Sequence, residues 1–258
     1  MIDALKQRLH AKSAALLLSL ETRLDRIMLG WLTLAGLASA LRIATSPIPA
    51  GMPDLSVMAP YLLLVFAPIA SMALALRWFA NGERMEQPTT RLALLGSWRR
   101  LGAADAKRHA LYGTTGIMVS LLVGMLLNVP VRALEYLAAI PALSGTVPEW
   151  LATLHLMMTF DVVLLSSLYT VAFVAALRRV PLFPRLLAAI WAVDLAMQLG
   201  IASIVAGTEG LPHGVAEALR NLLDGNAKKV LISIGLWLPY LLMSKRVNVT
   251  YRHRIERA

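Results

Sequence analysis

Long apolar runs separated by short polar segments dominate the pattern of hydrophobic and polar positions along the chain. Each run approaches or exceeds the ~20 apolar residues that a helix needs to cross a bilayer. The sequence therefore predicts an all-α, polytopic transmembrane helical bundle over residues 27–244. The six expected spans cover approximately 27–45, 55–80, 113–140, 150–177, 186–206 and 229–244.

Outside these spans, three segments also place apolar residues at helical spacing. Residues 1–26 predict an amphipathic helix that either lies on the inner leaflet or packs on the ends of the bundle. Residues 212–224 predict a short outward helix that ends at Gly225-Asn226. Residues 81–112 predict a second interfacial helix, through Leu94, Leu95, Trp98 and Leu101.

Composition agrees with a membrane protein. The chain is 58% hydrophobic, whereas soluble domains are ~45–50% apolar. No segment between two spans is long enough for a soluble domain of ~50 residues. A single membrane-embedded domain is the simplest interpretation.

Positive charge follows topology. Most of the 25 Lys and Arg residues lie in 1–26, 81–112, 178–185 and the basic tail 245–258, and the alternate segments are nearly bare. The positive-inside rule then places both termini in the cytoplasm, which requires an even number of spans. This distribution favours anionic lipid headgroups on the cytoplasmic face as partners and argues against nucleic acid.

Aromatic and basic residues near the expected inner ends of the spans predict contacts with the lipid interface, where indole and phenol rings prefer to lie. These residues are Trp31, Trp98, Arg99, Arg100, Trp237, Tyr240, Lys245 and Arg246.

Several chemistries are excluded by the residues themselves. The chain has no cysteine, which rules out disulfides, thiolate catalysis, iron–sulfur clusters and Cys-based zinc sites. His155 alone lies well inside a span, so a bis-histidine haem is not expected. Zinc-protease, serine-hydrolase and phosphate-loop motifs are missing from the sequence. The sequence predicts no catalytic residue, cofactor or metal site.

Polar residues inside the spans need an explanation, because a charge within the bilayer costs several kcal/mol. Arg132 and Glu135 are spaced to pair on one helix face, and Asp194 and Gln198 share a face. The depths of these residues allow one cluster to hold them all. The set forms either an outward-facing pocket for a solute, a lipid headgroup or a proton, or an internal network in which Arg42 and Arg132 neutralise Glu135, Asp161 and Asp194. The candidates are Arg42, Arg132, Glu135, His155, Asp161, Asp194 and Gln198.

Two motifs resemble a known family. The ending Trp237-Leu238-Pro239-Tyr240-Leu241, followed by Ser244-Lys245-Arg246-Val247 and Thr250-Tyr251, is similar to that of small bacterial inner-membrane proteins classed as a domain of unknown function. Gly30-Trp31-Leu32 resembles the start of the family's first helix, and Phe183-Pro184 and Phe160-Asp161 resemble two internal features.

The chain also departs from that family. Its members usually have about four helices, so 55–140 resembles an inserted pair. Leu29 stands where the family has Gly, and Tyr251 where it usually has Phe. The resemblance implies a multi-pass protein of the bacterial inner membrane and implies no activity.

These observations lead to a functional hypothesis. The leading one is a non-enzymatic accessory, assembly or regulatory subunit of a larger inner-membrane complex, with other membrane proteins as partners. The alternative is a small proton-coupled transporter or channel that uses Asp161 and Asp194. A membrane enzyme acting on a lipid-linked substrate, with His155 as base, is a third hypothesis.

Overall fold

The computed structural model describes residues 2–46, 54–89 and 96–257. Five helices within this part are long and apolar enough to cross a membrane, and a sixth qualifies when α8 (His213–Met243) and α9 (Lys245–Arg252) are counted as one span bent by 70°. The all-α, multi-pass prediction is therefore confirmed. The five are α2 (Leu24–Thr45), α3 (Leu55–Trp78), α5 (Ile117–Ala139), α6 (Glu149–Leu177) and α7 (Phe183–Ala206).

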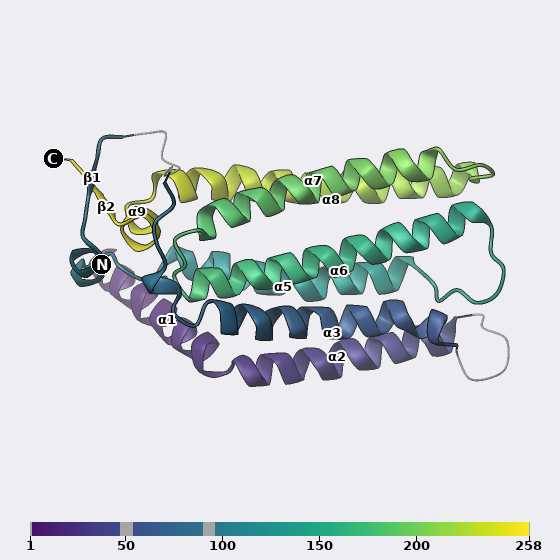
Figure 1. The fold of residues 1–258 in the computed structure, drawn as a ribbon, viewed down its shortest axis with the longest axis horizontal. Coiled ribbons are helices and arrows are strands. Elements are labelled where there is room, and N and C mark those ends of the chain that lie inside the picture. The colour runs from purple at the N-terminus through teal and green to yellow at the C-terminus, as the bar shows by residue number, and fades with distance from the viewer. Residues whose placement is uncertain (1, 47–53, 90–95, 258) are drawn as a thin grey trace.

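The spanning helices lie side by side along the long axis of the molecule, and both chain termini lie at the same end (Figure 1). α6 is the central helix and packs against α3, α5 and α7, whereas α2 packs on α3 and α5, and α8 packs on α7. In the most apolar stretch of α6, 67% of the residues are buried, against 11% in α2. Polar groups on α6 are thus enclosed by protein, and α2 faces the lipid.

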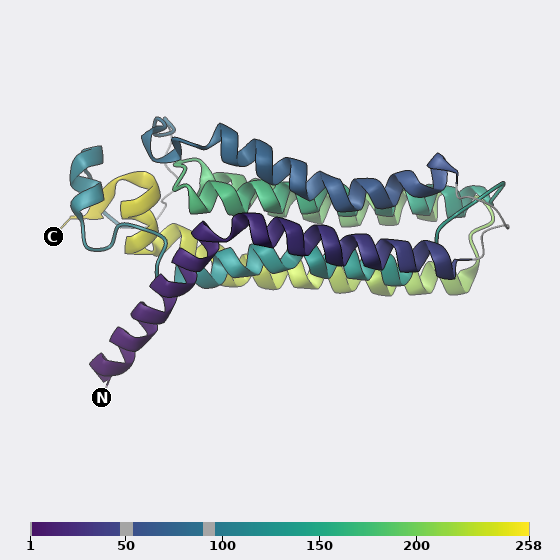
Figure 2. The same cartoon turned by 90° about the horizontal axis from the view of Figure 1, so that it is seen from below.

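The amino-terminal helix α1 (Ile2–Thr22) leaves the bundle at an angle (Figure 2). Its last turns return to the core, where Leu17 and Leu20 are buried in one cluster with Met118 and Val119. The predicted helix over 1–26 is present, divided near Arg23 from α2. Only the carboxyl-terminal turns of α1 pack against the end of the bundle.

Helix α8 corrects one prediction. The expected short helix at 212–224 and the last span are one continuous helix of 31 residues, which passes through Gly225 and Asn226 without a break. Leu219, Leu223 and Val230 are buried along one side of it. Packing against α7 therefore outweighs the local cost of about 1 kcal/mol for glycine in a helix.

The segment over 81–112 also differs from its predicted structure. Leu94 and Leu95 lie outside the described residues, and Trp98–Arg100 forms a strand, β1, instead of a helix. β1 pairs antiparallel with β2 (Arg254–Glu256), and the guanidinium of Arg254 lies 5.4 Å from the ring centre of Trp98. The segment otherwise holds a 3-10 turn at Gly82–Arg84 and the short helix α4 (Ala103–Arg108). The prediction of an interfacial helix was wrong, because backbone groups of β1 pair with a distant strand.

The predicted basic tail, 245–258, is folded from Lys245 to Glu256 into α9 and β2. Tyr251 is almost fully buried, and its hydroxyl donates to the carbonyl of Ala176 at 2.8 Å. Arg246 donates to the hydroxyl of Thr115 at 2.9 Å, and Lys245 pairs with Glu256 at 2.6 Å. The motif that carries the family resemblance thus fastens the chain terminus to the ends of α5 and α6.

Of the other residues predicted for the lipid interface, some contact other parts of the protein and some are exposed. Trp31 donates from its indole to the carbonyl of Val65 at 2.9 Å, and the rings of Trp237 and Tyr240 meet edge to face at 6.0 Å. Arg99 and Arg100 are exposed on β1. These two arginines keep the freedom to meet headgroups, whereas the indole N–H of Trp31 is already bonded within the protein.

Candidate polar site within the bundle

One arginine joins three spanning helices. Arg132 of α5 donates to an Asp161 carboxylate oxygen of α6 at 3.3 Å and to an Asp194 carboxylate oxygen of α7. The side chains are 10%, 7% and 0% exposed, in that order. Since charges this deeply buried are retained only when paired, Arg132 is the group that makes both carboxylates tolerable inside the bundle.

Gln198 completes the join between α6 and α7. Its amide nitrogen donates to Asp161 at 3.2 Å and to Asp194 at 3.4 Å. The spacing of Asp194 and Gln198 predicts a shared face, and the structure confirms it. One turn of α7 therefore presents both side chains to α6.

Two neighbours orient the charges. The side-chain oxygen of Asn128, one turn before Arg132, accepts from the arginine Nε at 3.0 Å. The hydroxyl of Tyr169 donates to Asp194 at 3.0 Å, and the Arg132 guanidinium lies 5.8 Å from the centre of its ring. Asp194 thus accepts from three side chains, which satisfies a carboxylate that has no contact with solvent.

A second ion pair corrects the predicted pairing of Arg132 with Glu135. Glu135 instead pairs with Lys229 of α8, because Arg132 points inward to the two aspartates. Asn226 connects the two groups: its oxygen accepts from Lys229 at 3.3 Å, and its nitrogen donates to Gln198 at 3.4 Å. We call these side chains the polar cluster: Asn128, Arg132, Glu135, Asp161, Tyr169, Asp194, Gln198, Asn226 and Lys229.

Arg42 and His155 lie outside the polar cluster. Arg42 donates to the backbone carbonyl of Ile140 at 3.0 Å, near the outer end of α5. The His155 ring lies 6.4 Å from the ring of Tyr136, and its Nε2 has no hydrogen-bond partner within the described part of the chain. The prediction that one cluster holds all seven candidates, with Arg42 neutralising carboxylates, was wrong for these two residues.

Two small clefts reach the polar cluster. One has a volume of ≈ 20 Å³ and is lined by Asp161 as well as Arg132, and the other has ≈ 50 Å³ and is lined by Lys229 as well as Arg132. On this measure a cavity needs ~10–15 Å³ to hold one water molecule. The clefts therefore have room for a few waters.

The charges of the polar cluster do not balance. Arg132 faces two carboxylates, and the nearby pair of Glu135 and Lys229 is neutral by itself. The cluster thus contains one carboxylate in excess. Among the residues that the structure describes, no group of three His, Asp or Glu side chains is placed to hold a metal ion.

Comparisons with known proteins add nothing to this geometry: no family model, no curated protein and no solved structure matches the chain. The resemblance of the carboxyl-terminal motif stays a prediction.

The sequence left four members of the polar cluster unassigned. Asn128 stands one turn before Arg132, so helical spacing places it beside its partner. Tyr169 stands two turns after Asp161 on the same side of α6, and its partner Asp194 comes from α7. Asn226 and Lys229 are three residues apart, but the glycine before Asn226 suggested a helix end and concealed their common face.

Proposed function

We propose that the protein is a non-enzymatic subunit of a larger complex in the bacterial inner membrane, and that α8 packs against a helix of a partner membrane protein. The observation that carries this proposal is a row of exposed charges on the outer half of α8. The bacterial inner membrane is part of the proposal through the family resemblance of the carboxyl-terminal motif.

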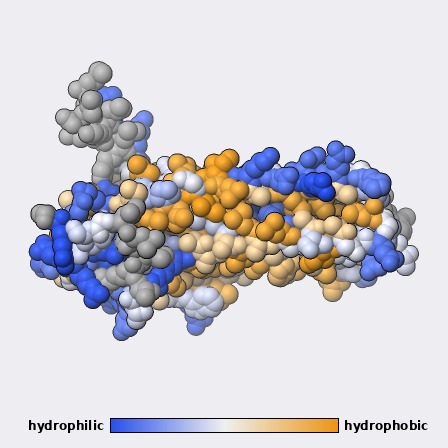
Figure 3. Space-filling view, turned by 90° about the horizontal axis from the view of Figure 1, so that it is seen from above, coloured by the Kyte–Doolittle hydropathy of each residue, from blue (hydrophilic) through white to orange (hydrophobic). Residues whose placement is uncertain are grey.

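The row follows one side of the helix. Glu217, Arg220, Asp224 and Lys228 are three or four residues apart, so they share a face. All four are exposed, and their charges alternate from acidic to basic. Figure 3 shows hydrophilic side chains along the edge of the outer half of the bundle, where α8 lies. We call these four residues the charged stripe.

Part of the charged stripe lies at the depth of the bilayer. Asn226 bonds to Gln198, which stands eight residues before the end of α7. At 1.5 Å per residue, this level is ~12 Å below the outer end of α7. Asp224 and Lys228 lie within one turn of it. A charged residue at the centre of a span costs ~2.5–3.5 kcal/mol in lipid, so a face of this kind needs a polar cover.

A partner helix supplies such a cover more readily than lipid does. A helix with the opposite order of charges, basic opposite Glu217 and acidic opposite Arg220, pairs each member of the charged stripe without leaving a buried charge alone. Its polar side chains also hydrogen-bond across the interface, as is usual between membrane helices.

The polar cluster supports a subunit more than a transporter. Both carboxylates are held by Arg132 and Gln198, and the adjoining clefts are small. The carboxylate in excess is the feature that favours proton coupling, but a transported solute needs more space than these clefts provide. The enzyme hypothesis is weaker still, because His155 lies outside the polar cluster.

The test is site-specific photocrosslinking in native membranes. A photoreactive residue replaces Asp224 in the charged stripe, and a matched control replaces Ile232, which is 70% exposed on the apolar half of the same helix. We expect a discrete protein adduct from position 224 and only lipid adducts from position 232. In a second step, Glu217→Lys with Arg220→Glu reverses the neighbouring charges and should abolish the adduct. Equal adducts at both positions, or a lone monomer in several mild detergents, contradict the proposal.

A further inference from the structure

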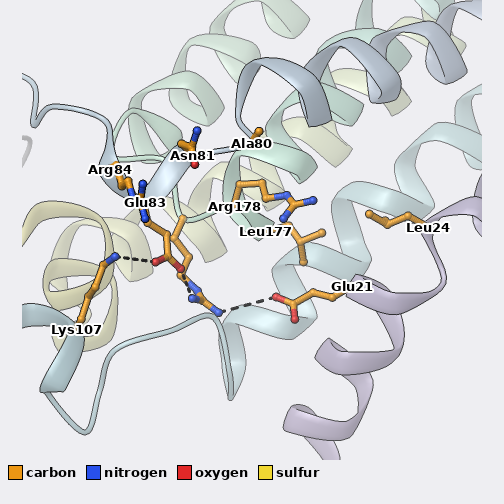
Figure 4. A pocket seen from close by; sticks show the side chains of 11 residues that line it. Glu21, Leu24, Ala80, Asn81, Glu83, Arg84, Lys107, Leu177 and Arg178 are labelled. Atoms are coloured by element: carbon orange, nitrogen blue, oxygen red, sulfur yellow. Dashed lines mark hydrogen bonds and ion pairs between the residues drawn. The ribbon is translucent and has the colours of Figure 1, made fainter.

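A second polar region lies at the end of the bundle that carries both termini. There a cavity of ≈ 390 Å³ opens between the end of α1, the start of α2, the 3-10 turn and the end of α6 (Figure 4). It is separate from the polar cluster, because along α6 Leu177 lies ~12 Å beyond Tyr169 and ~24 Å beyond Asp161. We call it the terminal cavity.

Tight backbone packing builds one wall of the terminal cavity. The amides of Arg179 and Val180 bond back to the carbonyls of Ala176 and Ala175 at 3.1 and 2.9 Å, which closes α6 with a Schellman turn. Arg179 has a φ of 55°, at a position where glycine is usual. A Cβ on Gly82 would lie 2.6 Å from the carbonyl oxygen of Arg178, so only glycine allows this approach. The wall is therefore fixed in shape.

Ion pairs hold the second wall. Glu83 accepts from Lys107 at 3.0 Å and also from Arg179. Arg179 reaches Glu21 at 3.9 Å, and its guanidinium lies 5.6 Å from the ring centre of Tyr112. Burial by itself would raise the pKa of Glu83, but hydrogen bonds and the charges of Lys107 and Arg179 lower it below the ordinary value. Glu83 is thus an ionised carboxylate that is paired with both Lys107 and Arg179.

Two arginines remain without a carboxylate. Arg84 and Arg178 line the terminal cavity, both are exposed, and neither has an ion-pair partner among the residues described. The cavity is lined by four cations and two carboxylates, which leaves two positive charges in excess. A guanidinium offers a planar fork of donors that matches the oxygens of a phosphate.

We propose that the terminal cavity binds a phosphate group, with Arg84 and Arg178, which lie on opposite sides of Glu83 (Figure 4), turning toward the phosphate as its ligands. A phospholipid headgroup and a soluble phosphate ester share this chemistry. The surroundings favour the lipid: an apolar groove of ≈ 260 Å³ begins at Ile27 and Met28, one turn along α2 from Leu24 in the cavity wall. A phosphate at the membrane interface then has an acyl chain directed along the helices.

The experiment is a lipid-binding titration of the full chain in detergent, followed by native mass spectrometry with phosphatidylglycerol as the probe. The test variant is Arg84→Gln with Arg178→Gln. The matched control is Arg108→Gln with Arg257→Gln, which removes the same charge from exposed positions in the last turn of α4 and after β2. We expect at least tenfold weaker binding in the test variant and less than a twofold change in the control.

A parallel arm uses glycerol phosphate as a soluble probe. Binding of this compound that depends on Arg84 and Arg178, without lipid binding, supports the phosphate site and assigns it to a soluble ligand. Equal losses in the test and control variants, or no binding of either probe, overturn the proposal. If the test variant does not fold, Arg84→Lys with Arg178→Lys keeps the charge but removes the fork, and it should still weaken binding severalfold. Because the charged stripe lies at the other end of the molecule, failure of either proposal leaves the other intact.

Discussion

At the scale of single residues, Arg132 stabilises the two buried carboxylates of Asp161 and Asp194 inside the bundle. It contacts Asp161 and Asp194, and Asp194 has no exposed surface. Gln198 and Tyr169 supply hydrogen bonds to the carboxylates but no charge. Only the guanidinium compensates the carboxylates electrostatically.

We therefore predict that Arg132→Gln lowers the free energy of unfolding by about 3–5 kcal/mol, because removal of one partner leaves buried charges uncompensated. The measurement is denaturant unfolding in mixed micelles. Arg42→Gln is the control, since Arg42 bonds only to a backbone carbonyl in the described residues, and it should cost about 1 kcal/mol. Equal losses from the two substitutions would show that Arg132 does not compensate the acids.

Sequence reasoning located the polar cluster and, in its alternative of internal pairing, the neutralisation of Asp161 and Asp194 by Arg132. It selected Arg132, Asp161, Asp194 and Gln198 correctly, because a polar group inside a span is conspicuous. It also paired Arg132 with Glu135, since spacing along one helix says nothing of which neighbour from another helix competes. The role of Lys229 depends on the placement of α8 against α5, and this placement is a tertiary property.

At the scale of elements, α9 explains the terminal motif of the chain. Its side chains are buried from Val247 to Arg252, although half of them are polar. The Tyr251 hydroxyl meets Ala176 in the last turn of α6, and Thr250 accepts from the amide of Gly113 at 3.0 Å.

We predict that Tyr251→Phe keeps the fold and costs about 1 kcal/mol, the net value of one hydrogen bond. The cost is limited because the Ala176 carbonyl also accepts from the amide of Arg179. Thermal unfolding of the purified chain measures the change. Tyr251→Ala empties a buried aromatic site and should cost about 3–5 kcal/mol; a similar effect of both substitutions would mean that the hydroxyl, and not the ring, dominates.

At the scale of the whole molecule, the spanning helices were largely predictable from the sequence, whereas the folded segments at the end of the bundle were not. Apolar runs of the right length fixed the spans, because lipid leaves few alternatives to a helix. The predicted interfacial helix and basic tail failed, since outside the membrane β1 found a partner far away in sequence. The orientation of the bundle stays a prediction from the positive-inside rule.

That orientation is testable because the chain has no cysteine of its own. We predict that a membrane-impermeant maleimide labels Glu209→Cys, in the turn before α8, on intact cells. Arg99→Cys, on β1 at the opposite end, should react only after permeabilisation. The reverse pattern would invert the orientation, and labelling of both sites on intact cells would contradict the three spans, α5 to α7, between them.

The pairing of β1 with β2 also sets an order of events during synthesis. Trp98 leaves the ribosome 158 residues (256 − 98) before its partner Glu256. At about 5–20 residues per second, this strand waits roughly 8–30 s with its backbone groups bonded to water. The spanning helices from α5 to α8 are made in that interval. The pairing of β1 with β2 is therefore completed last. A ribosome that stalls before Arg254 leaves a chain in which the spanning helices are inserted but β1 has no partner strand.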